Sequence, residues 1–314
     1  LLFHARRRDG QRAYRSPSTP AAPATRPARL CSHVMTSLID LDIAGRAPLR
    51  IEFAFIAPER SAAPLVVFLH EGLGSVAMWR DFPAQLCDAL GVRGLVYSRP
   101  GYGRSTPRRH DERWPVDYLE RHARDVLPPL LAAQGVDTAI DPPWFFGHSD
   151  GGSIALIFAA SFPDRVRGIA VAAPHIFVEA VTLDGIAATR ESYVKTPLRE
   201  RLGRFHDDVD SAFHGWNDAW LDPAFRAWNI EALLPAIRCP VLAIQGEEDE
   251  YATMAQIDGI AAGAPQTQLL KLAHCGHSPH RDQADAVIAA VAAWMQRHGA
   301  RVTLPASAEA PNRT

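Results

Sequence analysis

The stretch WFFGHSDGGSIALIFAASF, residues 144–162, decides the fold. It places Gly147-His148-Ser149-Asp150-Gly151 directly after a short apolar run and before a segment with helical period. The pentapeptide fits Gly-x-Ser-x-Gly, in which the serine occupies a sharp strand-to-helix turn and the glycines let neighbouring backbones come close. The stretch therefore predicts Ser149 as a nucleophile above the carboxyl edge of a sheet. The alternative is a tight turn with an incidental serine.

The rest of the chain repeats this alternation of strand and helix. Two stretches alternate apolar and polar residues, and six short apolar runs suit strands buried on both faces. These eight predicted strands are Leu38 to Ile43, Leu49 to Phe55, Leu65 to Leu69, Gly94 to Tyr97, Trp144 to Phe146, Ile169 to Ala173, Val241 to Ile244 and Leu269 to Leu272. The helical segments are Trp79 to Leu90, Val116 to Gln134, Ser153 to Phe162, Met254 to Ala262 and Ala284 to Arg297. A turn at Gly45 to Pro48 joins the first two strands. The pattern predicts an α/β fold, a mostly parallel eight-stranded sheet with helices on both faces.

One segment interrupts the alternation. Pro174 to Arg238 contains no convincing strand, and Glu179 to Val194, Pro197 to Phe205 and Asp210 to Trp220 read as helices. We predict a helical insert at 174–238 within a core made of 37–173 and 239–298. Phe213, Trp216 and Trp220 fall on one helical face. That stripe either packs the insert onto the core or roofs a substrate pocket.

The two ends of the chain differ in composition from the core. Residues 1–34 hold seven arginines and one acid, a charge of +6, which leaves -8 for the remainder because the total is -2. Such a segment cannot bury enough apolar surface to order itself. We expect it to be a disordered or non-native extension, since Met35 is the first methionine; an organelle transit peptide is the alternative. The tail 301–314 is expected to be disordered.

Overall composition excludes several classes of protein. The chain is 47% hydrophobic and 22% charged, and it lacks the basic stripe of a nucleic-acid binder. Its apolar runs are far shorter than the roughly 20 residues that span a bilayer. Cys31, Cys87, Cys239 and Cys275 are scattered and do not form a disulfide framework. We therefore expect a reduced, soluble, cytoplasmic protein with a small-molecule substrate and neither a nucleic-acid nor a membrane partner.

A serine nucleophile needs a base, and the base needs an orienting acid, in the order Ser, acid, His for this arrangement. His277 follows the last predicted strand, and Asp249 follows the strand that ends at Ile244. Both stand at carboxyl ends of strands, where open α/β sheets place their sites. Their rivals are close in sequence: His274 and His280 for the base, and Glu247, Glu248 and Glu250 for the acid.

An oxyanion hole completes such a site. One backbone N–H would come from Asp150, at the start of the elbow helix, and one from the glycine-rich loop His70 to Ser75. We expect no cofactor. We also expect no metal, because His274, Cys275, His277 and His280 lack a partner at zinc-binding spacing.

These motifs together resemble the α/β-hydrolase superfamily, in the subgroup with an inserted helical cap. Pro100 to Ser105 is similar to its P-G-x-G-x-S loop, Gly246 to Asp249 to its acid loop, and Gly276-His277 to its histidine loop. His70 to Ser75 resembles the H-G-x-x-G-S loop, which implies Gly72 N–H as an oxyanion donor. The loop departs from that pattern at Glu71, which could cap the loop, bind a cationic group or tune His277.

The resemblance also bears on the reaction. A serine disfavours the dehalogenases and epoxide hydrolases, which use aspartate. The elbow is similar to that of valacyclovir-type ester hydrolases, in which an acid after the nucleophile favours a cationic amine; alternatively Asp150 caps the elbow helix. We predict a serine hydrolase that cleaves a small carboxylic ester or lactone through an acyl-enzyme. The alternatives are a C–C bond hydrolase of a ring-cleavage diketone and a non-catalytic ligand receptor. We expect Glu71, His148, Trp216 and Trp220 to contact the substrate.

Overall fold

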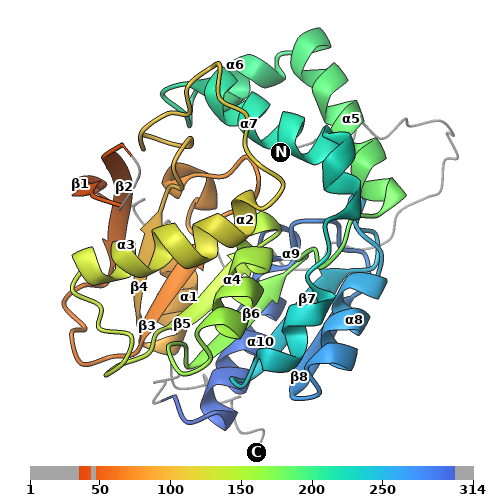
Figure 1. Cartoon of the computed structure of the whole chain (residues 1–314). Helices are drawn as coiled ribbons and strands as arrows, with labels where there is room; N and C mark the ends of the chain where they lie inside the picture. The colour runs from red at the N-terminus through yellow and green to blue at the C-terminus, as the bar shows by residue number, and fades with distance from the viewer. Residues whose placement is uncertain (1–34, 44–46, 301–314) are drawn as a thin grey trace, which may run out of the picture. The chain divides into compact units, whose positions relative to one another are not determined.

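An eight-stranded sheet organises the chain. The computed structural model describes residues 35–43 and 47–300, and its strands follow the order β1-β2-β4-β3-β5-β6-β7-β8 (Figure 1). The bounds are β1 Ser37–Leu41, β2 Leu49–Ile56, β3 Leu65–Leu69, β4 Arg93–Tyr97, β5 Trp144–His148, β6 Gly168–Ala172, β7 Val241–Gly246 and β8 Thr267–Leu272. β1, β2 and β4 pair antiparallel in turn, and the strands from β4 to β8 are parallel. The predicted α/β fold with a mostly parallel sheet is confirmed.

Helices cover both faces because the central strands are apolar on both. β3, β5, β6 and β7 are buried along their whole length, and Phe68 stands in register with Val96 on one side and Phe146 on the other. One face packs against α1 Phe82–Leu90 and α10 Ala284–Arg297. The other packs against α3 Leu127–Ala133, α4 Asp150–Ser161 and α8 Ala255–Gly263. The sheet thus separates two apolar cores.

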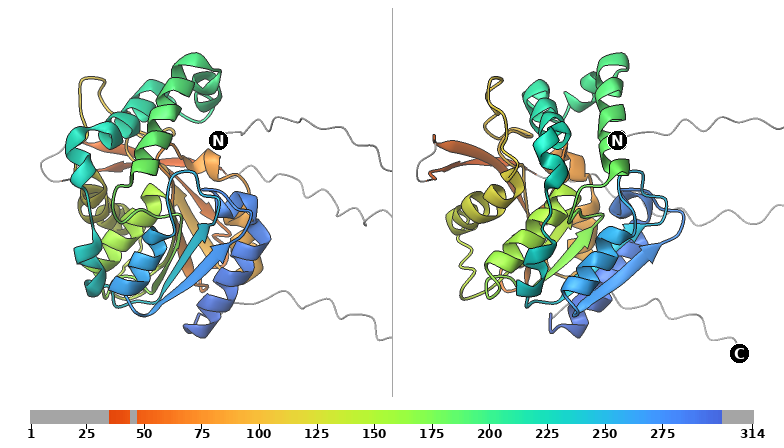
Figure 2. Two further views of the ribbon diagram at one scale, coloured as in Figure 1. Left: turned by 90° about the vertical axis from the view of Figure 1, so that its right-hand side faces the viewer. Right: turned by 45° about the vertical axis from the view of Figure 1, so that its right-hand side comes forward.

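Between β6 and β7 the chain forms the helical insert. It contains α5 Ala180–Lys195, α6 Leu198–Leu202 and α7 Val209–Leu221, followed by the short 3-10 helices η3 Pro223–Ala227 and η4 Glu231–Ala236. In Figures 1 and 2, α5 to α7 lie together at one end of the sheet. The rings of Tyr193 and Phe213 stack at 3.6 Å between centroids and join α5 to α7. Periodicity did not predict η3 and η4, because helices of five or six residues are too short to show a period.

Local chemistry moved two predicted helix boundaries. The helix predicted at Trp79 to Leu90 begins three residues later as α1. Trp79 instead ends a separate 3-10 helix, η1 Val76–Trp79, and Arg80 follows it at φ 55°. Pro83 explains the new start, because proline is tolerated in the first turn of a helix and disrupts its interior. α4 begins at Asp150 and not at Ser153, so the helix starts directly after the serine.

The remaining elements are short. α2 Tyr118–Arg121 continues through η2 His122–Val126, one turn of π-helix, into α3, and α9 Pro279–Asp282 precedes α10. The predictions for 1–34, for the tail 301–314 and for the part of the first turn at 44–46 lie outside the described residues. Among the helices of 35–43 and 47–300, none is long and apolar enough to cross a membrane.

Candidate active site

Ser149 occupies a strained turn between β5 and α4. Its φ of 52° and ψ of -119° lie outside the regions that non-glycine residues ordinarily populate. The neighbouring glycines make the turn possible. A Cβ on Gly147 would lie 2.3 Å from the carbonyl oxygen of Gly151, and a Cβ on Gly151 would lie 1.9 Å from that of Leu69. Strain of this kind persists only where the surrounding structure enforces it, and here it projects the hydroxyl from the sheet edge.

The structure brings Ser149, His277 and Asp249 into one hydrogen-bonded line. Ser149 Oγ donates to His277 Nε2 at 3.0 Å. His277 Nδ1 donates to the two carboxylate oxygens of Asp249 at 2.8 and 3.0 Å. Each residue follows the carboxyl end of a different strand, β5, β8 and β7 respectively. This geometry leaves His277 Nε2 free to accept the serine proton.

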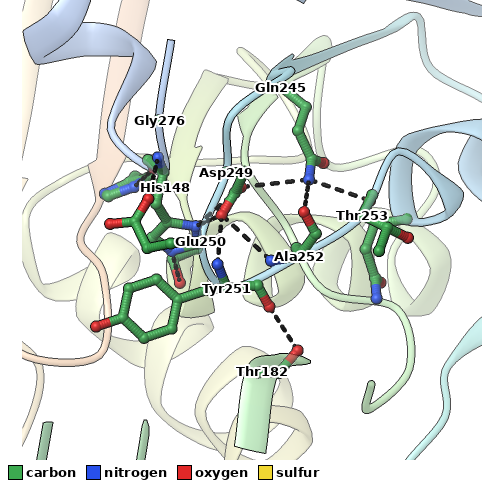
Figure 3. Close-up of polar contacts among 12 residues, drawn as sticks. His148, Thr182, Gln245, Asp249, Glu250, Tyr251, Ala252, Thr253 and Gly276 are labelled. Atoms are coloured by element: carbon green, nitrogen blue, oxygen red, sulfur yellow. Dashed lines mark hydrogen bonds and ion pairs between the residues drawn. The ribbon is translucent and has the colours of Figure 1, made fainter. Parts of the chain in front are cut away.

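The loop after β7 holds Asp249 rigidly (Figure 3). Its carboxylate accepts the N–H groups of Tyr251 at 2.8 Å and Ala252 at 3.2 Å, and the amide of Gln245 at 3.2 Å. Burial alone would raise the pKa of Asp249, but the charge and hydrogen bond of His277 outweigh burial and lower it. Asp249 is therefore held as an anion facing His277.

His277 is enclosed on several sides. The backbone N–H of His277 donates to the Glu250 carboxylate at 3.2 Å, and the backbone carbonyl of His277 accepts from His148 Nε2 at 2.7 Å. The ring of Tyr251 lies 4.8 Å from the imidazole. Burial disfavours the charged imidazole, but the charge and hydrogen bond of Asp249 outweigh this effect and raise the pKa of His277 above its ordinary 6.5.

The sequence rivals of His277 and Asp249 point elsewhere. His274 is exposed and pairs with the exposed Glu248 at 3.1 Å. His280 is buried, with its ring 5.1 Å from that of Trp79. Glu250 receives a backbone N–H and does not contact the imidazole nitrogens through any described hydrogen bond. Within 35–43 and 47–300, no group of three or more His, Cys, Asp or Glu side chains is arranged to hold a metal ion.

The glycine-rich loop after β3 lies under the insert. A Cβ on Gly72 would lie 2.1 Å from Nε1 of Trp216, so α7 presses its indole against this loop. The carbonyl of Glu71, in the same peptide group as the Gly72 N–H, accepts from His70 Nδ1 at 2.7 Å, Arg99 Nη2 at 2.8 Å and Gly74 N at 3.0 Å. The peptide is thus held by three donors on its oxygen.

The side chain of Asp150 is enclosed within the protein. One carboxylate oxygen accepts from the Trp220 indole at 3.2 Å, and the other from the Tyr118 hydroxyl at 2.9 Å and from Arg99 Nη2 at 3.3 Å. The side chains of Arg99 and Asp150 are only 3% and 1% exposed. The carboxylate therefore has a cation inside the protein. It is also the acidic group of the first turn of α4, although none of its described hydrogen bonds goes to the backbone of that turn.

The residues expected to contact substrate have different surroundings. Trp216, Trp220 and His148 are all buried. Trp216 contacts the Gly72 loop, whereas the ring N–H groups of Trp220 and His148 donate to Asp150 and to the His277 carbonyl. Glu71 lies 3.3 Å from Arg281 and 3.6 Å from His148 Nδ1. Burial alone would raise the pKa of Glu71, but His148 and Arg281 hold it well below its ordinary value.

Two residues to which sequence reasoning assigned no role stand beside these groups. Arg99 follows β4 and joins the Glu71 carbonyl to Asp150. His175 follows β6, and its ring lies 5.8 Å from that of His277 and 5.0 Å from that of Trp220. Both stand just beyond carboxyl ends of strands, which is the signal that could have identified them.

Comparison with known proteins agrees with this fold. The profile described as the alpha/beta hydrolase family matches residues 66–290. Serine hydrolase BPHL of Mus musculus is 27% identical over 198 residues, which cover 61% of this chain, and the Homo sapiens protein is 26% identical over the same length. The match spans 65% of each of these relatives, just under two thirds of their length.

Solved structures give the same fold. A thermophilic esterase from Thermogutta terrifontis superposes with a TM-score of 0.61 at 20% identity, covering 83% of this chain and 99% of the esterase. The enol-lactonase from Burkholderia xenovorans LB400 gives 0.60 at 20% identity, covering 82% and 100% respectively.

Proposed function

The chain belongs to the alpha/beta hydrolase family, and we propose that it is a serine hydrolase that cleaves a small carboxylic ester or lactone through an acyl-enzyme. The observation that carries this proposal is the line from Ser149 through His277 to Asp249, with hydrogen bonds of 3.0 and 2.8 Å. The strained conformation of Ser149 supports it, because it places the hydroxyl where a substrate carbonyl can approach.

In this mechanism Ser149 Oγ attacks the carbonyl carbon while its proton passes to His277 Nε2. Asp249 keeps the imidazole in the required tautomer and stabilises its charged form. The N–H groups of Gly72 and Asp150 hold the oxyanion, an interaction worth roughly 3 to 4 kcal/mol per donor in comparable sites. The imidazolium then protonates the leaving alcohol, and a water activated by His277 releases the acid.

Two contacts bear on the substrate. Trp216 lies against the Gly72 loop, which restricts the space above the oxyanion position and favours a small acyl group. Asp150 is already neutralised by Arg99, so its carboxylate is not available to attract an ammonium group. We therefore expect uncharged acyl groups to be preferred over amino-acid esters. The names of the serine hydrolase, the esterase and the enol-lactonase above are consistent with such chemistry.

A 4-nitrophenyl ester series from acetate to decanoate tests the proposal. We expect turnover by the wild-type protein to peak at a short chain and to decline as the chain lengthens, because Trp216 limits the acyl space. A glycine ester compared with the matching acetate ester should be the poorer substrate. Absence of turnover across the series by a folded protein would contradict the proposed activity.

The pH profile provides a separate prediction. His277 must be neutral to accept the serine proton, so activity should fall as the pH decreases through its pKa. Because Asp249 raises the pKa of His277 above 6.5, half of the maximal kcat/KM should be reached above that pH. Measurement of kcat/KM on 4-nitrophenyl acetate between about pH 5 and about pH 9 would show this decrease of activity on the acidic side. A profile that remains flat down to pH 5 would argue against His277 as the base.

A further inference from the structure

One nitrogen of the Arg99 guanidinium donates two hydrogen bonds. Each goes to a residue that lies beside, or contains, one of the two expected N–H donors of the oxyanion hole. Nη2 donates to the carbonyl of Glu71 at 2.8 Å and to the carboxylate of Asp150 at 3.3 Å. Glu71 lies in the loop after β3, and Asp150 begins α4 after β5. Arg99 itself follows β4, so three strand ends meet at one buried cation.

The first bond controls the direction of a backbone N–H. A peptide group is planar and trans, so its C=O and N–H point in opposite directions. The Glu71 carbonyl and the Gly72 N–H belong to one such group. The three donors on the carbonyl, from Arg99, His70 and the Gly74 backbone, therefore direct the Gly72 N–H away from themselves. A cation on the carbonyl also polarises the peptide, which strengthens its N–H as a donor.

The second hydrogen bond, from Arg99 to the Asp150 carboxylate, holds the residue that supplies the other expected oxyanion donor. Asp150 supplies the other expected donor through its backbone N–H, and its carboxylate is held by Arg99, Tyr118 and Trp220. Its position as the first residue of α4 leaves that N–H without a partner inside the helix. A shift of this carboxylate would move the first turn of α4 relative to Gly72.

Arg99 is itself held in place. Its backbone N–H donates to His70 Nε2 at 2.9 Å, while His70 Nδ1 donates to the same Glu71 carbonyl at 2.7 Å. Its guanidinium carbon lies 4.7 Å from the centre of the Tyr102 ring. The cation therefore has little freedom to release either contact.

We propose that Arg99 is a positioning residue that aligns the Gly72 and Asp150 N–H donors of the oxyanion hole with each other. This inference rests on the proposed function, since the donors act on the oxyanion formed there. In the competing role, Arg99 only compensates the negative charge of the buried Asp150 and does not align the N–H donors. The two roles predict different kinetics.

The test compares Arg99→Met with Arg108→Met. Arg108 is a matched control, because it is also buried and lines the same cavity of about 410 Å³, yet it bonds to backbone carbonyls such as that of Ser211 and reaches neither oxyanion loop. On 4-nitrophenyl acetate, Arg99→Met should lower kcat about 100-fold with KM changed little, because a misplacement of about 1 Å can have that effect. Arg108→Met should lower kcat far less than Arg99→Met does, because none of the described hydrogen bonds of the Arg108 side chain reaches Glu71, Gly72 or Asp150. A folded Arg99→Met with the kcat of the Arg108 control would overturn the proposal.

A double variant separates alignment from charge compensation. Arg99→Met/Asp150→Asn removes both charges. No unpaired charge is then left inside the protein, so the double variant should fold better than Arg99→Met alone. If Arg99 aligns the peptide, kcat of the double variant stays well below that of Asp150→Asn alone. Recovery to the level of Asp150→Asn would show that Arg99 only balances charge, and would reject the inference.

Chemical rescue adds a readout that a general structural role would not move. The cavity lined by Arg99, Tyr102 and Tyr118 adjoins the space that Arg99→Ala would open. Guanidinium chloride at millimolar concentration should restore part of kcat in Arg99→Ala and none in Arg99→Met, where the side chain still fills the space. Equal responses of the two variants would count against a specific guanidinium site.

A fluorophosphonate separates failure of this inference from failure of the proposed function. Ser149 Oγ forms a bond to phosphorus, fluoride leaves, and the serine proton passes to His277, while the phosphoryl oxygen occupies the oxyanion position. If the wild-type protein is labelled but does not turn over esters, the proposed ester substrate is rejected. The labelling rates of Arg99→Met and Arg108→Met can still be compared. Arg99→Met should then label about 100-fold more slowly than Arg108→Met; equal rates, or no labelling of any variant, would overturn the inference.

Discussion

Ser149→Ala should remove ester turnover almost completely, with kcat reduced by about five to six orders of magnitude. The hydroxyl is the atom that attacks the carbonyl, and no other described side chain donates to His277 Nε2. Alanine can occupy the same strained turn, because it has the same Cβ as serine and leaves the close backbone contacts of Gly147 and Gly151 unchanged. The expected change is therefore in kcat and not in folding.

The measurement is kcat on 4-nitrophenyl acetate, together with thermal unfolding of both proteins. Ser161→Ala is a suitable control, since Ser161 ends the same helix α4 and bonds only to the side chain of Arg124 among its described side-chain contacts. The control should keep wild-type kcat. If Ser149→Ala retained more than a few percent of the activity, another nucleophile would be responsible and the mechanism above would be wrong.

Asp249→Asn should lower kcat by about 10⁴-fold while leaving KM nearly unchanged. The N–H groups of Tyr251 and Ala252 both donate to one carboxylate oxygen, so an asparagine would place its own oxygen there. Its NH2 group would then take the second position, which lies 3.0 Å from His277 Nδ1 and 3.2 Å from the donating amide nitrogen of Gln245. An NH2 group there can accept from neither of these donors, and it favours the His277 tautomer with the proton on Nε2, which blocks proton transfer from the serine.

Glu248→Gln is the matched control for this variant. Glu248 is the neighbouring acid, but it is exposed and pairs with the exposed His274. Its loss should change kcat by less than about twofold, because exposed ion pairs contribute little. The experiment measures kcat, KM and the unfolding temperature of both variants. A similar loss in both would mean that the general charge of the loop matters more than the contact with His277.

Local patterns in the sequence were sufficient for the fold and for the strand ends at which the three residues of the hydrogen-bonded line lie. Buried parallel strands show as short apolar runs, and their order in the chain follows from the alternation with helices. The turn at Ser149 can be recognised in the sequence, because only glycine fits at positions 147 and 151, where a Cβ would collide with the backbone. Ser149, Asp249 and His277 each lie within five residues of the carboxyl end of a strand, so the same rule indicated the location of all three.

The sequence by itself therefore determined the α/β architecture, the strained serine and the strand ends that carry polar groups, since each depends on neighbours within a few residues. Only the tertiary structure decided which of several adjacent acids and histidines meet, and what Asp150 contacts. The Arg99 nitrogen joins groups 28 and 51 residues away in the chain. Such contacts depend on the order of strands in the sheet and on the packing of α7, which local periodicity does not encode.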